Sequence, residues 1–404
     1  MATPVADLVA AIYADGWSRI VATLIRFTGG DWDLAEECAQ EAFAQALRKW
    51  PSTGVPDQPL AWLTTAARNR AVDVIRRSAT EARKLREVAA MEPGPVPARD
   101  SEIPDDRLEL MFTCCHPSLK VEAQVALTLR SLTGISTAEI ARAFLIPERI
   151  MAQRLFRAKQ KIKHAAIPFR VPPAHLLPER VPAVLHVLYL LFNVEYSELS
   201  QSRVSDDAIR LTQVLAALMP DEPEAQGLLA LMLLHGARRA ARTSPDGDLI
   251  PLEEQDRGLW DQQRIAEGEQ LLERALRRGR PGPYQIQAAI AACHATTPVA
   301  AQTDWPQIAA LYTQLLRLVP TPVVALNRVV AIGMAEGPEV ALPLLDGLSE
   351  DDALDAYYLL PATRADLLRR AGRLEEARAS YATALSLAPS EAERRYLMRR
   401  LAEP

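Results

Sequence analysis

Two proline-rich segments limit how this chain can fold. Residues 91–106 read "MEPGPVPARDSEIPDD" and residues 167–182 read "IPFRVPPAHLLPERVP". Proline lacks an amide donor and disfavours helix in the residue before it, so neither segment favours continuous regular structure. The residues before, between and after them show helical patterns of apolar residues. We therefore expect three helical blocks joined by two extended connectors.

Length and composition agree with this division. The chain is long enough for roughly two to three domains, and its many Ala, Leu and Arg residues favour helices. We predict an all-α protein with two small helical domains followed by an α-helical repeat domain. The expected order is a first domain at 1–90, a flexible Pro-rich linker at 91–106, a second domain at 107–167, a Pro-rich connector at 168–182 and a helical C-terminal extension at 183–404.

Several classes of function lack their sequence signals. There is no GxxxxGK phosphate loop, HExxH motif or GxSxG elbow, so we assign no catalytic residue and expect no enzyme. The N-terminus lacks a basic segment followed by an apolar run, and no long apolar stretch occurs, which predicts a cytoplasmic protein without a membrane segment. The cysteines lack zinc-finger spacing, so we predict buried structural residues and no metal or cofactor. They are Cys38, Cys114, Cys115 and Cys293.

Residues 135–163, "ISTAEIARAFLIPERIMAQRLFRAKQKIK", have the spacing of a helix-turn-helix. Ser136 and Glu139 form a capping box, which predicts a helix that starts near Thr137 and stops before Pro147. Proline is favoured at the first position of a helix, so a second helix should begin there. The apolar stripe expected to face the first helix consists of Met151, Leu155, Ala158 and Ile162.

The opposite side of that second helix has the chemistry of a DNA-reading surface. Arginine can bind guanine and glutamine can bind adenine in the major groove, each through two hydrogen bonds. The candidate base-reading residues are Arg149, Gln153, Arg154 and Arg157. Lys159, Lys161 and Lys163 suit phosphate contacts, which position a protein without specifying a sequence. The alternative is a solvated basic face on an ordinary bundle helix.

Residues 57–77, "DQPLAWLTTAARNRAVDVIRR", are a second candidate for nucleic-acid contact. Unstacked bases pack on aromatic side chains while cations follow the backbone, so this mixture suits a partly melted duplex. The candidate residues are Trp62, Arg68, Asn69, Arg70, Asp73, Arg76 and Arg77. Trp62 could equally be a core residue.

The preceding segment, residues 31–50, is acidic on its polar positions. These positions hold Asp33, Glu36, Glu37, Gln40 and Glu41. An acidic face repels DNA, so we expect it to bind a basic protein surface.

The C-terminal extension contains a repeat signal. Tyr312 and Pro320 have the same spacing as Tyr381 and Pro389, which matches the aromatic-to-proline spacing of a tetratricopeptide helix pair. The two prolines lie about two 34-residue periods apart. The expected packing residues of an intermediate unit are Ala341 and Leu345. A plain helical bundle without a groove is the alternative. We also expect the acids Glu253, Glu254 and Asp256 to offset the charge of the basic segments.

These motifs together resemble a known family. "DLAEECAQEAFAQALRKW" followed by "PLAWLTTAARNRAVDVIRR" resembles region 2 of an extracytoplasmic-function sigma factor. "AQVALTLRSLTGISTAEIARAFLIPERIMAQRLFRAKQKI" resembles its region 4. With "LELMFTCCHPSL" and the long tail, the chain is similar to the subgroup with a tetratricopeptide-like C-terminal extension (ECF42-like).

The resemblance implies the partners and the roles of the candidate residues. It implies binding of core RNA polymerase, at the beta-prime clamp helices and the beta flap, and of promoter DNA. Binding to the clamp helices is implied for Asp33, Glu36, Glu37, Gln40 and Glu41, contact with the minus-ten element for Trp62, Arg68, Asn69, Asp73, Arg76 and Arg77, and contact with the minus-thirty-five element for Arg149, Gln153, Arg154, Arg157 and Lys161. The extension would regulate activity, which could include contact with the sigma regions and puts a dedicated anti-sigma factor in doubt.

One alternative from another class stays open. A helix-turn-helix regulator with a tetratricopeptide-type sensor domain would bind promoter DNA without acting as a sigma factor. That reading accounts for residues 135–163 and for the tail. It leaves the acidic segment and residues 57–77 without a role.

Overall fold

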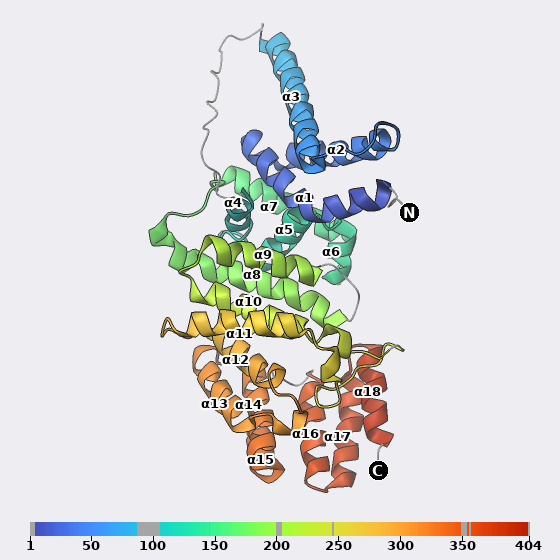
Figure 1. Ribbon diagram of the computed structural model, residues 1–404, viewed down its shortest axis with the longest axis vertical. Helices are drawn as coiled ribbons and strands as arrows, with labels where there is room; N and C mark the ends of the chain where they lie inside the picture. Colours follow the sequence, from blue (N-terminus) through green and yellow to red (C-terminus); the bar gives the residue numbers. More distant parts are fainter. Residues whose placement is uncertain are drawn as a thin grey trace. The chain divides into compact units, whose positions relative to one another are not determined.

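The protein is built from α-helices. The computed structural model describes residues 5–86, 106–144, 146–198, 204–244, 246–348, 354 and 357–402. Within those ranges no strand occurs, and Thr243 and Leu249 form one isolated antiparallel bridge. The predicted all-α class is confirmed. The chain separates into two compact units, Met1–Val214 and Leu215–Pro404, coloured from blue to green and from green to red in Figure 1.

The first three helices of unit 1 form what we call the N-terminal module. They are α1 (Val5–Phe27), α2 (Trp32–Thr53) and α3 (Pro59–Arg86). All three pack against one another, and Trp17 and Leu63 are fully buried. The Asp31 carboxylate caps α2 by accepting a hydrogen bond from the Leu34 amide at 3.1 Å.

The next helices form the helix-turn-helix module. They are α4 (Asp106–Cys114), α5 (Val121–Thr128), the π-helical turn η1 (Leu129–Thr133), α6 (Thr137–Ala143) and α7 (Glu148–His164). The predicted linker 91–106 lies outside the described residues except for Asp106, which starts α4.

Unit 1 continues beyond the predicted end of its second domain. The next elements are η2 (Ala174–Leu176), α8 (Leu177–Glu198) and α9 (Val204–Leu218). Thus α8 begins inside the predicted connector 168–182 and packs on α4 and α5, where the Arg180 guanidinium donates to the Phe112 carbonyl at 2.6 Å. Val184 and Leu188 of α8 are fully buried, and such tertiary burial outweighs the local proline signal. The division into units after Val214 therefore differs from the predicted boundary before residue 183.

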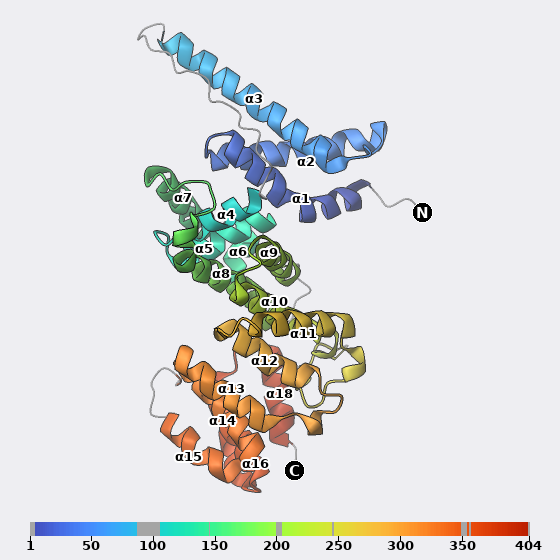
Figure 2. The same cartoon turned by 60° about the vertical axis from the view of Figure 1, so that its left-hand side comes forward.

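Unit 2 is a series of helices in which neighbours along the chain pack side by side (Figure 2). Its helices are α10 (Pro223–Gly236), α11 (Gln262–Leu276), α12 (Pro283–Ala295), α13 (Trp305–Leu318), α14 (Pro322–Glu336), α15 (Pro338–Leu348), α16 (Leu359–Arg370), α17 (Leu374–Leu387) and α18 (Glu391–Ala402). Short 3-10 turns lie at η3 (Arg239–Ala241), η4 (Arg257–Leu259) and η5 (Ala300–Gln302).

Some of the residues singled out by the repeat spacing lie in the cores between these helices, whereas Pro320 and Pro389 are exposed and Tyr312 is half-buried. Tyr381 and Ala384 of α17 are buried in one cluster with Leu397. The residues expected to pack an intermediate unit, Ala341 and Leu345 of α15, are fully buried in another cluster. The repeat spacing therefore predicted buried positions in α15 and α17 correctly.

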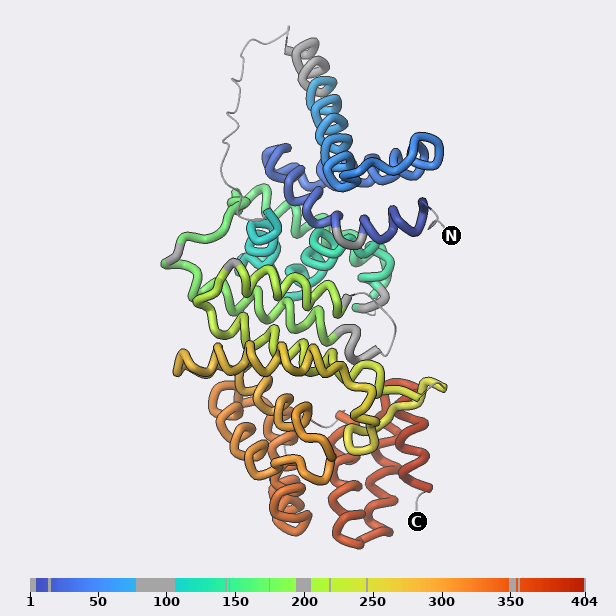
Figure 3. The backbone as a smooth tube through the Cα atoms, viewed as in Figure 1, coloured from blue at the N-terminus to red at the C-terminus, as the bar shows by residue number. Residues whose placement is uncertain are grey.

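A long connection between α10 and α11 is tied to the last helices of unit 2. Glu253 pairs with Arg370 at 2.8 Å, and Glu254 lies 3.6 Å from both Arg399 and Arg400. Figure 3 shows the yellow tube of this connection beside the red C-terminal helices. Two of the three acids that we expected to offset the basic segments, Glu253 and Glu254, are therefore engaged with arginines of their own unit, while Asp256 accepts a hydrogen bond from the Gly258 amide at 2.8 Å.

Among the described residues, no single helix is both long enough and apolar enough to cross a membrane. The segments Val5–Tyr13 and Gly16–Phe27 meet that requirement only when taken together, and they are bent relative to each other by 58°.

The cores of unit 2 can be tested with two adjacent leucines of α15. Leu345 is fully buried, whereas Leu344 is 41% exposed. Leu345→Ala is expected to reduce the free energy of unfolding of this unit by about 2–5 kcal/mol, because it leaves a cavity. Urea denaturation followed by circular dichroism measures the change. Leu344→Ala is the matched control, and an equal loss in both variants would contradict the assigned packing.

Candidate nucleic-acid and protein interfaces

The helix α7 separates a buried side from a basic exposed side. Its buried residues are Met151, Leu155, Ala158 and Ile162, which is the predicted stripe. The predicted base-reading residues Arg149, Gln153 and Arg157 are exposed, and so is Lys161. Arg154 is half-buried, with its guanidinium 5.6 Å from the Phe144 ring centroid, so part of its surface is used within the module.

The predicted capping box is present at the start of α6. The Ser136 amide donates to Glu139 Oε2 at 3.0 Å, and the Glu139 amide donates to Ser136 Oγ at 3.2 Å. This reciprocal pair confirms the predicted helix start at Thr137. The prediction for Pro147 was off by one position, because Pro147 is the N-cap, with extended ψ of 141°, and α7 starts at Glu148.

A hollow between α2 and α3 brings together residues from both predicted sets of the N-terminal module. Its volume is about 630 Å³. Trp62, Asn69 and Asp73 of α3 line it, together with Glu41 of α2. Trp62 is half-buried, and its ring centroid lies 5.5 Å from that of the buried Trp50 in an edge-on arrangement. Trp62 thus packs partly on the core and partly faces the hollow, and its contact with nucleic acid stays a prediction.

The hollow also contains residues that the sequence reasoning missed. Gln45 and Lys49 of α2 and Thr65 of α3 line it as well. Their spacing is the signal that could have found them, since Gln45 and Lys49 follow Glu41 at intervals of four along one helix face. Thr65 precedes Asn69 by the same interval.

Three of the predicted cations of α3, Arg68, Arg76 and Arg77, are not among the residues that line the hollow. Arg68 is exposed, and its guanidinium lies 5.1 Å from the Phe27 ring centroid. Arg76 and Arg77 are exposed farther along α3. Arg70 does line the hollow and lies 3.6 Å from Glu37.

The acidic face of α2 is unevenly exposed. Asp33, Glu37, Gln40 and Glu41 are exposed, and Glu41 pairs with Arg48 of the same helix at 2.6 Å. In contrast, Glu36 is only 6% exposed. The acidic residues therefore fall into an accessible group and one covered carboxylate.

Glu36 is covered by two cations of the helix-turn-helix module. Its Oε2 atom accepts a hydrogen bond from Arg130 Nε at 3.2 Å. Its Oε1 atom lies 2.9 Å from Lys159 Nζ, an ion pair that lacks hydrogen-bond geometry. The same lysine donates to Asp33 Oδ1 at 2.9 Å. One lysine of α7 thus joins two acids of α2.

The cysteines of unit 1 are buried inside the protein. Cys38, Cys114 and Cys115 are buried as predicted, while Cys293 of unit 2 is half-buried. Burial raises the pKa of the Cys115 thiol to about 12, against a smaller lowering by its hydrogen bond with Thr128. A thiol with such a pKa is protonated at neutral pH and is a poor nucleophile.

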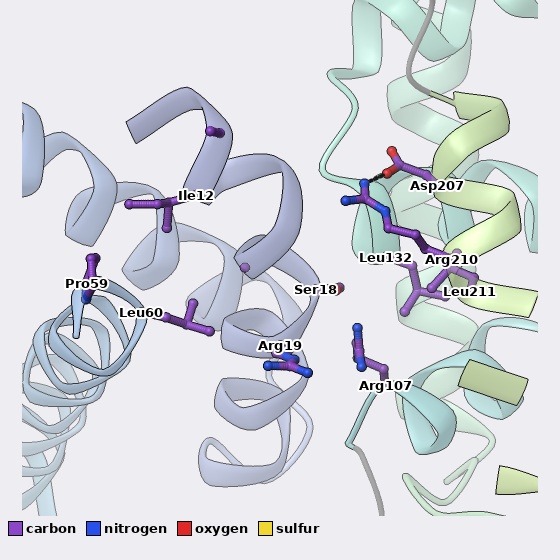
Figure 4. Close-up of a pocket in the computed structure, with 12 residues that line it drawn as sticks. Ile12, Ser18, Arg19, Pro59, Leu60, Arg107, Leu132, Asp207, Arg210 and Leu211 are labelled. Carbon is purple, nitrogen blue, oxygen red and sulfur yellow. Dashed lines mark hydrogen bonds and ion pairs between the residues drawn. The ribbon is translucent and has the colours of Figure 1, made fainter. Parts of the chain in front are cut away.

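A second cavity, of about 470 Å³, lies where α1 and the start of α3 face α4, η1 and α9. Figure 4 shows Arg19 and Arg107 on opposite sides of this cavity, with Leu60 and Leu132 among its apolar walls. The N-terminal and helix-turn-helix modules are therefore not fully packed against each other here.

Three stretches of the chain match known families. Residues 15–81 match the family described as Sigma-70 region 2, and residues 109–162 match Sigma-70, region 4. Residues 180–276 match a family of unknown function (DUF6596). An uncharacterized protein of Rhizobium meliloti (strain 1021) is 43% identical over 383 residues, which cover 91% of this chain and 89% of that protein. The first two matches coincide with the N-terminal and helix-turn-helix modules.

Proposed function

We propose a division of labour for this chain, which belongs to the sigma-70 family and contains its regions 2 and 4. These regions make it a sigma factor for promoter-specific transcription initiation, a role that requires core RNA polymerase and promoter DNA as partners. In the proposed division, the acidic face of α2 binds the polymerase. The hollow between α2 and α3 takes the minus-ten element, and α7 takes the minus-thirty-five element.

The hollow is the observation that carries the proposal most directly. It combines an aromatic face, an amide and cations from two helices in a space of about 630 Å³. Trp62 offers a stacking surface for an unpaired base, and Asn69 offers both a donor and an acceptor for its edge. Lys49 and Arg70 supply charge for the phosphates. Such a set fits a base that has left the duplex better than it fits a closed groove.

The two different sides of α7 support its assignment to a second DNA element. Its apolar side is buried and anchors the helix in the module, and the exposed Arg149, Gln153 and Arg157 form a row at intervals of four on another side. Side chains of these types can read base edges in a major groove. Lys161 is placed to contact the backbone.

We assign a regulatory role to the C-terminal extension, as in the subgroup of extracytoplasmic-function sigma factors that this chain resembles. The support is its size, since unit 2 is a separate compact unit with its own hydrophobic clusters. A regulator without sigma activity would use α7 in the same way. It would have no use for the hollow or for the acidic face of α2.

Transcription with purified core polymerase tests the role of the hollow. Run-off transcription from a promoter of the protein's own operon should depend on the added chain. Asn69→Ala should reduce it on the order of tenfold, because one base contact is worth about 1–3 kcal/mol. Gln263→Ala, which removes an exposed amide from unit 2, is the control. DNA binding without any transcription would instead support the regulator that lacks sigma activity.

Two variants of α7 should have different effects on duplex DNA that contains the minus-thirty-five element. Arg149→Ala is expected to relax base preference at one position, because arginine reads guanine specifically. Lys161→Ala should weaken binding to all sequences and reduce the slope of log affinity against log salt by about 0.9. Fluorescence anisotropy over a salt series measures both effects. Identical behaviour of the two variants would argue against base reading by Arg149.

Removal of unit 2 tests regulation by the extension. The shortened chain should end at Val214, the last residue of unit 1, because α8 and most of α9 belong to that unit. The initiation rate of the shortened chain should be at least a few times higher or a few times lower than that of the full chain. Circular dichroism should first show that it retains its helices. Equal rates in run-off transcription would remove the regulatory role.

A further inference from the structure

We propose that the cavity between α1, α4 and α9 binds a small organic anion, which consists of an apolar body and a carboxylate or phosphate group. The volume of the cavity, about 470 Å³, is within the range of ligand pockets. Its described lining residues all belong to unit 1, and none belongs to the surfaces assigned above to polymerase or to the two promoter elements. A ligand in this cavity is therefore a further partner, separate from polymerase and DNA.

The apolar walls of the cavity come from different parts of unit 1. Leu60 lies at the start of α3, Leu132 in η1 and Leu211 in α9. Protein interiors are packed as densely as organic crystals, so an open space of this size leaves apolar contacts unmade. An apolar group that enters the space gains these contacts and leaves water. Walls of this kind distinguish the cavity from a surface that binds a phosphate backbone, for which cations suffice.

The charged groups of the cavity favour an anion. Three helices each contribute an arginine, namely Arg19 of α1, Arg107 of α4 and Arg210 of α9. Of the lining residues that the structure describes, Asp207 is the single acid, and it forms an ion pair with Arg210. The cations at these walls therefore outnumber the acids. A guanidinium can bind a carboxylate or a phosphate through two parallel hydrogen bonds, which suits both anionic groups.

Ser18 adds a hydrogen-bonding group to the same cavity. It is 7% exposed, and its hydroxyl has no hydrogen-bond partner among the residues that the structure describes. In Figure 4, Ser18 lies on the side of α1 that faces Arg107 and Leu132. A hydroxyl that is largely removed from bulk water needs a partner, and an anionic oxygen beside it can accept its hydrogen bond. Ser18 and the arginines thus offer donors, whereas the leucines offer apolar contact.

A ligand can reach the cavity from solvent beside α1. Ala11 and Arg19, two lining residues of this helix, are exposed. Within the described part of the chain, Arg19 forms no ion pair. Its guanidinium can therefore turn toward an incoming anion without breaking an existing one. The apolar body of the ligand then lies toward Leu132 and Leu211, which are each only 4% exposed.

Calorimetric titration of the full chain with simple amphiphiles tests the site. Decanoate and decyl phosphate should each bind with one molecule per chain, and the tighter of the two shows whether the site prefers a carboxylate or a phosphate. Decanol should bind at least about tenfold more weakly than the tighter anion, because it lacks the charge that the arginines recognise. Octanoate should bind on the order of tenfold more weakly than decanoate, because fewer methylene groups are buried.

Two variants of α1 locate the binding. Arg19→Met should weaken binding of the anions on the order of tenfold and leave binding of decanol unchanged, because it removes only a charge. Ala11→Phe should weaken binding of anions and decanol alike, because its ring fills part of the cavity. The matched controls are Arg277→Met and Ala10→Phe, which change exposed residues outside the cavity. Circular dichroism should show that every variant retains its helices.

The outcomes are clear for each variant. Binding of an anion that is weakened in Arg19→Met but not in either control would establish the site, even if Ala11→Phe failed to fold. Equal affinities for anions and decanol, or equal affinities of all variants, would indicate adsorption to apolar surface elsewhere and would overturn it. The same holds if neither anion shows saturable binding. The sigma factor role is unaffected by any of these results, because transcription with core polymerase tests it separately.

Discussion

A helix in a small domain can bury only one of its faces, and the surfaces of this protein follow from that constraint. In α7 the buried stripe leaves the arginines on the outside. In α2 the apolar side that holds Phe43 and Trp50 packs into the module, so the acids point away from that core. Folding thus creates one basic and one acidic surface from neighbouring helices before any partner is present. The ion pairs around Glu36 arise where these two surfaces meet.

The features that could be predicted from the sequence are those set by residues at regular helical spacing within one short segment. The Ser136–Glu139 box, the stripe that begins at Met151 and the packing role of Leu345 all depend on residues within a few turns of one another. Even the members of the hollow could be found in this way, because two helix faces with intervals of four supply most of them. The sequence reasoning missed Gln45 because it looked for charge and aromaticity and not for the period.

The contacts that were not predicted connect residues far apart in the chain. Arg130 and Glu36 are separated by 94 residues, and no period in the sequence links them. The start of α8 was missed for a related reason, since α8 packs on α4 and α5, and the burial of its apolar residues outweighs its prolines. The sequence could show that Glu36 and Lys159 are charged. It could not show that each is neutralised by the other.

Acids in the connection between α10 and α11 are paired within unit 2. Glu253 and Glu254 lie within ion-pair distance of arginines in α16 and α18, so much of their field is cancelled locally. The remaining field of exposed charges is screened over about 8 Å at physiological ionic strength. An extension that only adds negative charge to the chain would therefore have little effect on DNA binding. If it regulates initiation, it must do so through direct contacts, which depend on the shape of its helices as well as on its charge.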